Sequence, residues 1–237
     1  MSGVRARYDL DVNRREWLAG RRAGVRARYD AESVGYDAEG GDYPTPLHGA
    51  FVDRLVSTTP LGGRILDAAC GTGKWFARVA DAGRRVVGVD QSAGMLAGAR
   101  AKGIAEATEQ VGLQELSFAA EFDGAMVIDA MENVPPEDWP TVVANLRRAL
   151  RSGGHLYLTL EEQDEADVAA AFERLAASGA PAVLGEVIEG DTAGYHFYPG
   201  RTQVLAWLTD GGFELLAEDF DQQPGWGYRH LLLRAID

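Results

Sequence analysis

Two acids, each at the end of an apolar run, are the residues of this sequence best suited to binding chemistry. Asp67 ends the run 64–67 and is followed by a glycine turn at 70–73. Asp90 ends a second run at 86–90, and it comes 17 residues after Gly73. A strand, a glycine turn and a second strand ending in an acid indicate the first βαβ unit of a nucleotide-binding α/β domain. The spacing is close to the roughly 20 residues at which such an acid accepts hydrogen bonds from an adenosine ribose.

The same loop lacks the residues that hold phosphates. A dinucleotide fingerprint, G-x-G-x-x-G, has its third glycine where this sequence has Phe76. A P-loop begins with glycine and ends with serine or threonine, but Ala68 and Trp75 occupy those two positions. The sequence therefore indicates an adenosine ligand without phosphates. S-adenosylmethionine (SAM) fits, with its carboxylate facing the amides of the turn 71–73.

Four segments, taken in order, resemble the class I SAM-dependent methyltransferases, and specifically their small-molecule branch. The loop 67–73 is similar to the first motif of that family and 88–92 to its ribose-binding motif. Residues 122–129 resemble its fourth strand, and 146–156 the helix, turn and fifth strand that follow. The resemblance runs from about Tyr29 to the C-terminus. It implies an α/β fold: a Rossmann-like, seven-stranded, doubly wound sheet of order 3-2-1-4-5-7-6 with an antiparallel seventh strand.

Apolar periodicity and turn residues predict the elements that must position these motifs. We expect an N-terminal arm and helical lid at 1–45 and a SAM-binding domain at 46–237, with a β-hairpin cap at about 181–200, turning at Gly190-Asp191. Strands are expected near 64–68, 86–90, 105–110, 123–128, 154–160, 213–219 and 227–235. Helices are expected near 47–56, 73–82, 92–101, 138–150, 165–178 and 202–211.

The N-terminal arm contains a repeated segment. Residues 3–9 recur identically as 24–30, and only the second copy continues into Ser33 and the segment 35–37, which resembles the family's N-terminal lid. A local duplication or an upstream start explains the first copy simply. A dimerisation arm or an extra lid helix is the alternative, and the sequence does not separate them.

Composition narrows the class of protein. The net charge of -13 argues against a nucleic-acid substrate, because phosphate binding relies on basic surfaces. No apolar run approaches the roughly 18 residues of a membrane span, and the charged N-terminus does not resemble a secretory signal. The single cysteine, Cys70, suits a reducing cytoplasm. We therefore expect a cytoplasmic protein that binds neither nucleic acid nor membrane, of unassigned oligomeric state.

The resemblance implies roles for individual residues around the cofactor. Asp90 binds the ribose, and Asp67 orients the loop and reaches the methionine amino group, although a structural role in capping the turn is the alternative. Gln91 and Met95 line the adenosine, Leu113 lies against adenine, and Gln114 reads its amino group. The full predicted cofactor set is Asp67, Ala69, Gly71, Gly73, Asp90, Gln91, Met95, Leu113, Gln114, Asp129 and Ala130.

Aromatic and acidic residues in the lid and cap are the candidates for binding the methyl acceptor. They are Tyr29, Tyr36, Glu132, Tyr195 and Tyr198. The same aromatic residues would equally form a packed lid, and the hairpin would then only pack on the domain.

Methyl transfer is an in-line displacement in which the protein mainly positions the reactants. An oxygen or carbon acceptor also needs a base, and histidine is the usual one. His196, in the cap, is our first candidate and His48, near the lid, the second. No metal is predicted, because the chain lacks Cys or His pairs at ligand spacing. A divalent site on Asp129 and the pair 161–162, as in catechol-type methyltransferases, is the alternative.

The sequence thus predicts an enzyme that transfers a methyl group from SAM to a small-molecule acceptor. Secondary metabolism is suggested by the resemblance and by the preference for arginine over lysine, because Lys74 and Lys102 are the only lysines. Two alternatives stay open: an enzyme that uses SAM as a structural cofactor for a cyclisation, and a non-catalytic SAM-binding module. The acceptor atom (O, N or C) is not predicted.

Overall fold

One mixed sheet of seven strands forms the centre of the protein. The computed structural model describes residues 12–38, 44–189 and 194–236. The strand order is β3-β2-β1-β4-β5-β9-β8, which is 3-2-1-4-5-7-6 when only these seven strands are counted, as predicted. β9 is antiparallel to β5. The strands are β1 (Arg64–Ala68), β2 (Arg85–Asp90), β3 (Ala107–Gln110), β4 (Phe122–Val127), β5 (Leu150–Gln163), β8 (Phe213–Gln223) and β9 (Trp226–Ala235).

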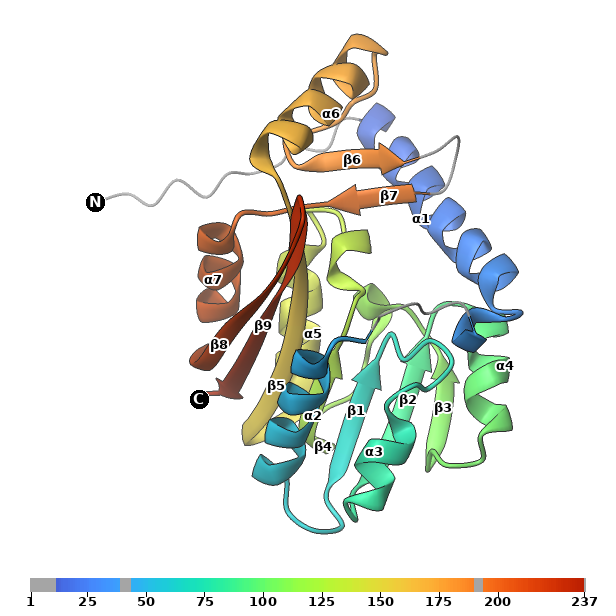
Figure 1. Ribbon diagram of the computed structural model, residues 1–237, viewed down its shortest axis with the longest axis vertical. Helices are drawn as coiled ribbons and strands as arrows, with labels where there is room; N and C mark the ends of the chain where they lie inside the picture. Colours follow the sequence, from blue (N-terminus) through green and yellow to red (C-terminus); the bar gives the residue numbers. More distant parts are fainter. Residues whose placement is uncertain (1–11, 39–43, 190–193, 237) are drawn as a thin grey trace.

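Helices cover both faces of this sheet (Figure 1). Successive strand residues point to opposite faces, so Ile65 packs in one core cluster and Leu66 in the other. The cluster that contains Ile65 also contains residues of α2 (Pro46–Thr58), α3 (Phe76–Asp81) and α4 (Ala93–Ala101). The cluster that contains Leu66 also contains residues of α5 (Trp139–Ala149) and α7 (Arg201–Asp210). Burial on both faces explains why the central strands are continuous apolar runs.

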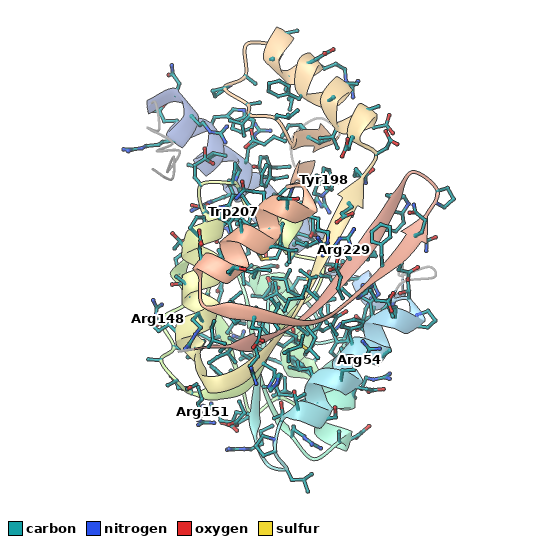
Figure 2. The ribbon with its side chains drawn as sticks, turned by 90° about the vertical axis from the view of Figure 1, so that its left-hand side faces the viewer. Arg54, Arg148, Arg151, Tyr198, Trp207 and Arg229 are labelled. Carbon is teal, nitrogen blue, oxygen red and sulfur yellow. The ribbon has the colours of Figure 1, made fainter. Side chains whose placement is uncertain are left out.

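Aromatic side chains join the two helices of the second face. Trp207 of α7, labelled in Figure 2, stacks on Trp139 of α5 with ring centroids 5.2 Å apart. Trp139 is completely buried. Large buried rings contribute much of the apolar area that stabilises such a layer.

The predicted cap hairpin is present as a separate two-stranded sheet. β6 (Glu186–Glu189) pairs antiparallel with β7 (Gly194–Phe197), and the predicted turn at Gly190-Asp191 lies outside the described residues. The hairpin follows α6 (Glu165–Ala177) and lies beyond the carboxyl ends of the strands (Figure 1). α1 (Val12–Glu32) runs from this hairpin toward α4 (Figure 1). It contains the second copy of the repeat, whereas the first copy is outside the described part of the chain.

Two predicted boundaries differ from the structure for identifiable reasons. The helix expected from residue 73 begins only at Phe76, because Gly71 and Gly73 have φ of 54° and 76°, which a right-handed helix does not allow. β5 and β8 end later than expected because both pair with β9 as far as Trp226, and β5 also begins earlier, at Leu150, which pairs with Phe122 of β4. The other helices and strands start or end within a few residues of their predicted bounds. Three short 3₁₀ turns, at Tyr36–Ala38, Leu113–Glu115 and Met131–Asn133, complete the described elements.

Within the described residues, no helix combines the length and the apolarity needed to cross a membrane. The division into an arm at 1–45 and a domain at 46–237 stays a prediction.

Candidate functional site

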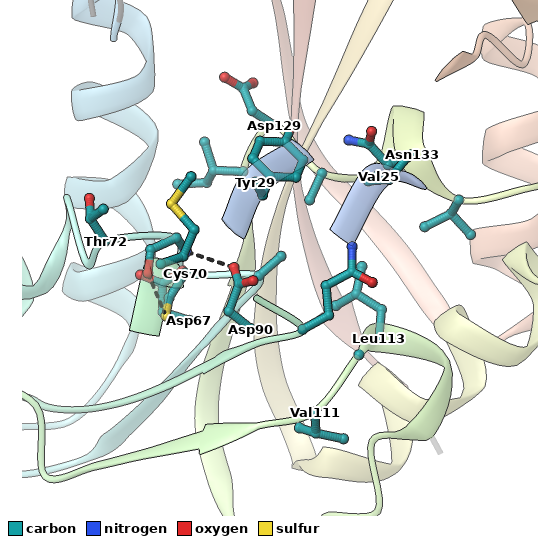
Figure 3. Close-up of a pocket in the computed structure, with 18 of the residues that line it drawn as sticks. Val25, Tyr29, Asp67, Cys70, Thr72, Asp90, Val111, Leu113, Asp129 and Asn133 are labelled. Carbon is teal, nitrogen blue, oxygen red and sulfur yellow. Dashed lines mark hydrogen bonds between the residues drawn. The ribbon is translucent and has the colours of Figure 1, made fainter. Parts of the chain in front are cut away.

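A cavity lies at the carboxyl ends of β1, β2 and β4, under α1 (Figure 3). Most of the predicted cofactor and acceptor residues line it, from segments far apart in the chain. These are Tyr29, Tyr36, Asp67, Ala69, Gly71, Asp90, Gln91, Met95, Leu113, Gln114, Asp129 and Ala130. Predicted residues that are not among the lining are Gly73, His48, Glu132, Tyr195, His196 and Tyr198.

The glycine loop forms the floor of the cavity with a strained backbone. Ala69 has φ of 63° and Gly71 of 54°, both in the left-handed region. The N–H of Gly71 donates a 2.9 Å hydrogen bond to Oδ2 of Asp90, and the N–H of Cys70 donates to the carbonyl of Val89 at 2.8 Å. Left-handed backbone at a non-glycine residue is uncommon and clusters at functional sites. These bonds hold the loop after β1 against the end of β2.

Phe76, which replaces the third glycine of a dinucleotide fingerprint, is completely buried beside this loop. A Cβ added at Gly73 would lie 2.5 Å from its ring, and one added at Gly88 would also lie 2.5 Å from it. The two glycines therefore make room for the aromatic ring, and the ring packs where a third glycine would allow a pyrophosphate to approach.

Asp90 is held rigidly at the end of β2. Its Oδ1 accepts from the N–H of Ser92 at 2.8 Å, in addition to the bond from Gly71. Burial raises the pKa of Asp90, and the hydrogen bonds from Ser92 and Gly71 oppose this rise. A carboxylate has about four lone-pair sites, so Asp90 can still accept bonds from ribose hydroxyls.

Asp67 is the buried acid of the cavity that lacks a matching donor. It is 2% exposed, and its Oδ2 has no hydrogen-bond partner among the described residues. Burial, and then the charge of Asp90, raise the pKa of Asp67 to about 8. An unpaired buried carboxylate is costly, and an ammonium group placed beside it would remove that cost. Asp67 and Asp90 therefore fit the amino and ribose groups of SAM.

α4 and the segment after β3 supply an apolar surface. Met95, Val111 and Leu113 line the cavity there. Nδ2 of Asn145 donates to the carbonyls of Leu113 and Gln114 at 3.1 and 2.9 Å, which fixes this turn. Such a surface suits an adenine ring.

Asp129 stands on the opposite wall, after β4. Its φ is 50°, and its N–H donates to Oγ1 of Thr159 at 2.8 Å. Tyr29, Tyr36 and Asn133 line the same side of the cavity. Figure 3 shows Tyr29, Asn133 and Asp129 across the cavity from Asp67 and Asp90.

Glu132 lies behind this wall. It is 7% exposed, Nδ2 of Asn133 donates to its Oε1 at 3.1 Å, and its Oε2 has no hydrogen-bond partner in the described structure. Burial, and then the charges of Asp129 and Glu161, raise the pKa of Glu132 well above its usual value. Glu132 therefore holds a proton more readily than an exposed glutamate.

The two candidate bases occupy different places. His48 is completely buried, its Nε2 lies 3.7 Å from Oδ1 of Asp129, and Oγ1 of Thr45 is 2.9 Å from its Nδ1. His196 lies in β7, where its ring is 5.9 Å from that of Tyr198. His48 thus contacts a residue of the cavity wall, whereas His196 belongs to the cap.

The cap tyrosines have structural partners. The hydroxyl of Tyr195 donates to Glu186 at 2.8 Å, and its ring meets Trp17 of α1 edge-on at 5.9 Å. The hydroxyl of Tyr198 donates to Glu161 at 3.4 Å. Tyr195 therefore joins the cap to α1.

Other lining residues were not predicted. They are Arg22, Val25, Cys70, Thr72, Lys74, Trp75, Val111, Gly112, Ile128, Asn133 and Val134. Several are direct neighbours of predicted residues. Arg22 and Val25 are different, because they come from α1, where the spacing of Leu18, Val25 and Tyr29 on one helix face was the available signal.

Known proteins of one kind, the methyltransferases, are similar to this chain. Residues 65–154 match the family model described as "Methyltransferase domain". The chain is 29% identical over 194 residues to the ubiquinone biosynthesis O-methyltransferase of Methylococcus capsulatus, covering 78% of this chain and 77% of the relative. These matches confirm the predicted resemblance to the class I SAM-dependent methyltransferases. SAM is the cofactor of this family, as the sequence predicted.

Solved methyltransferases share the fold. The 1,6-didemethyltoxoflavin-N1-methyltransferase of Burkholderia thailandensis, crystallised with 1,6-didemethyltoxoflavin and S-adenosylhomocysteine (SAH), has a TM-score of 0.70 and 18% identity. That match covers 96% of this chain and 92% of the other. The cyclase SpnF has a TM-score of 0.62 and 18% identity, covering 92% and 96%. Methyltransferases and a cyclase thus share this architecture, so the fold alone does not select the reaction.

Proposed function

We propose that the protein transfers a methyl group from SAM to a small-molecule acceptor, in secondary metabolism. One observation carries this proposal: a single cavity has the buried carboxylates Asp67 and Asp90 on one side and the wall of Asp129, Asn133 and Tyr29 on the other. When bound, SAM supplies a methyl group already activated by its sulfonium. Asp90 binds the ribose hydroxyls, Asp67 pairs with the amino group, and Met95 and Leu113 contact the adenine.

Asp129 is our candidate for the group that receives the proton of the acceptor. Its carboxylate lines the cavity and has His48 behind it at 3.7 Å. His48 acts through Asp129 by orienting the carboxylate. His196, the first candidate from the sequence, lies in β7 of the cap and does not line the cavity.

The acceptor is a small molecule that reaches the wall formed by Tyr29, Tyr36 and Asn133. The relatives act on different atoms: one is named an O-methyltransferase and another an N1-methyltransferase. The proposal therefore names the class of acceptor and leaves its atom to a screen.

The proposal is tested by calorimetric titration of the purified protein with SAM, SAH and NAD. Micromolar binding of SAM and SAH without NAD binding is expected, and acceptors are then screened by a mass gain of one methyl group. Binding of NAD alone would overturn the proposal in favour of an oxidoreductase.

A cyclisation that needs bound SAM but consumes none is the second candidate, since SpnF shares the fold. SAH formation discriminates between the two: it accumulates with the product of methyl transfer and does not accumulate in a cyclisation.

A further inference from the structure

A buried arginine near the start of α1 binds two carboxylates at once. Arg14 is 8% exposed, and its Nη1 and Nη2 donate to Glu186 at 3.0 and 2.9 Å. Its Nε and Nη2 also donate to Glu137 at 2.5 and 3.0 Å. Burial lowers the pKa of Arg14, but hydrogen bonds and charges of Glu186 and Glu137 outweigh it and leave this pKa above its usual value. Paired bonds of this kind fix geometry as well as charge.

Glu186 of β6 is the centre of this cluster. It is completely buried, and it also accepts from the hydroxyl of Tyr195 at 2.8 Å and from the N–H of Val183 at 2.7 Å. Arg14 additionally donates to the carbonyl of Pro181 at 2.6 Å. The cluster thus joins three separate segments: α1, the hairpin region and the loop after β4 that carries Glu137.

The helix that Arg14 anchors is the one that covers the cavity. Arg14, Leu18, Val25 and Tyr29 follow one another at helical spacing, and Val25 and Tyr29 line the cavity. At the other end of α1, Asp30 accepts from Oγ of Ser92 at 2.6 Å and from the N–H of Gly94 at 3.0 Å. α1 is therefore attached at both ends, to the hairpin and to α4, with the cavity between them (Figure 1).

We infer that Arg14 is a positioning residue: it fastens α1 to the β6–β7 hairpin, so that the cover of the cavity and the cap open and close as one body. Separating α1 from the hairpin would break the paired bonds between Arg14 and the completely buried Glu186, which is strongly unfavourable, whereas joint opening keeps these bonds and breaks those to Glu137. Entry of the cofactor and of the acceptor into the cavity beneath α1 then requires the cap to move with α1. The inference rests on the proposed function only in taking the cavity as the cofactor site.

Hydrogen exchange on the wild-type protein tests the coupling without any substitution. In the ligand-free protein, peptides from α1 and from 186–189 and 194–197 are expected to exchange with the same protection factor, within threefold. Protection of the two regions that differs by more than tenfold would overturn the inference. Adding SAH is expected to slow both regions by the same factor, and slowing of α1 alone would also overturn it. Failure of SAH to bind would count against the proposed function, and the ligand-free comparison would still decide the coupling.

Limited trypsin digestion of matched variants tests the residue itself. Arg14→Gln and Arg15→Gln each remove one cleavage site from α1, but Arg15 is exposed. We expect Arg14→Gln to be cut at the remaining arginines of α1 at least tenfold faster than Arg15→Gln, with SAH dissociating at least fivefold faster. Equal rates for the two variants would overturn the inference.

Global unfolding is distinguished from local opening by where the cuts fall. Loss of the whole fold exposes Arg229 and Arg234 of β9 as well, whereas opening of α1 leaves β9 protected. Should Arg14→Gln fail to fold, Arg14→Lys is compared with Arg15→Lys by the same criterion, because lysine keeps the charge but loses the paired bonds.

Discussion

The backbone N–H of Gly71 donates a 2.9 Å hydrogen bond to the carboxylate of Asp90, which joins the glycine loop after β1 to the acid at the end of β2. The two groups that the sequence predicts for one ligand thus also support each other. The bond fixes the carboxylate with lone pairs left for the ribose.

We expect Asp90→Ala to weaken SAM binding at least tenfold, because the lost hydrogen bonds to a charged group contribute about 1.5–3 kcal/mol. Calorimetry measures the affinity, and circular dichroism checks that the fold is retained. Glu109→Ala, which removes an exposed acid from neighbouring β3, is the matched control and leaves the affinity unchanged. An unaltered affinity in Asp90→Ala would disprove the ribose assignment.

The contact between His48 and Asp129 predicts a separation of binding from catalysis. His48→Gln leaves the carboxylate of Asp129 without the side chain that orients it. We therefore expect kcat to fall by about 10²-fold, the lower end of general-base effects, while the affinity for SAM stays within threefold. Turnover is measured with the acceptor found in the mass screen. His196→Gln is the comparison variant, with a smaller effect on kcat. A larger decrease in kcat for His196→Gln than for His48→Gln would instead indicate that the general base lies in the cap.

The buried carboxyl of Asp67 predicts a pH dependence of stability. Its pKa is about 8 in the folded protein and about 3.9 when unfolded, so between pH 4 and 8 the folded state binds more protons. Stability contributed by the protonated group is therefore present at pH 4 and decreases as the pH rises toward 8. The slope from this one group is at most about 1.4 kcal/mol per pH unit.

Urea unfolding of wild type and Asp67→Asn at several pH values between 4 and 8 measures this dependence. The difference between the two proteins isolates Asp67 from other buried acids such as Glu132. As the pH rises from 4 to 8, the free energy of unfolding of Asp67→Asn is expected to fall less steeply than that of the wild type. Parallel curves would show that Asp67 does not take up a proton on folding in this range.

Gly73→Ala is expected to destabilise the protein by about 2–4 kcal/mol. The residue has φ of 76°, and a Cβ would lie 2.5 Å from the buried ring of Phe76, so backbone strain and overpacking add. Gly103→Ala is the matched control, because its φ is 64° but its added Cβ meets nothing within 4 Å. In chemical denaturation, the free energy of unfolding of Gly103→Ala should be about 1–2 kcal/mol lower than that of the wild type. Equal losses in both would mean that the contact with Phe76 is easily relieved.

The sequence by itself determined the fold and one side of the site. Apolar runs such as 64–68 and 86–90 are buried on both faces, and that pattern specifies parallel strands covered by helices. Because the carboxyl ends of parallel strands meet at one edge, Asp67 and Asp90 had to lie close together, and they line one cavity.

Only the tertiary structure decided which residues form the opposite side of the site. His48 meets Asp129, and Arg14 meets Glu186 across 172 positions of sequence, through packing that no local pattern records. Local periodicity describes which face of α1 is buried but not what that face covers, so Arg22 and Val25 were not expected in the cavity. Buried ion pairs depend on desolvation and on partners from distant segments, and these exist only once the chain has folded.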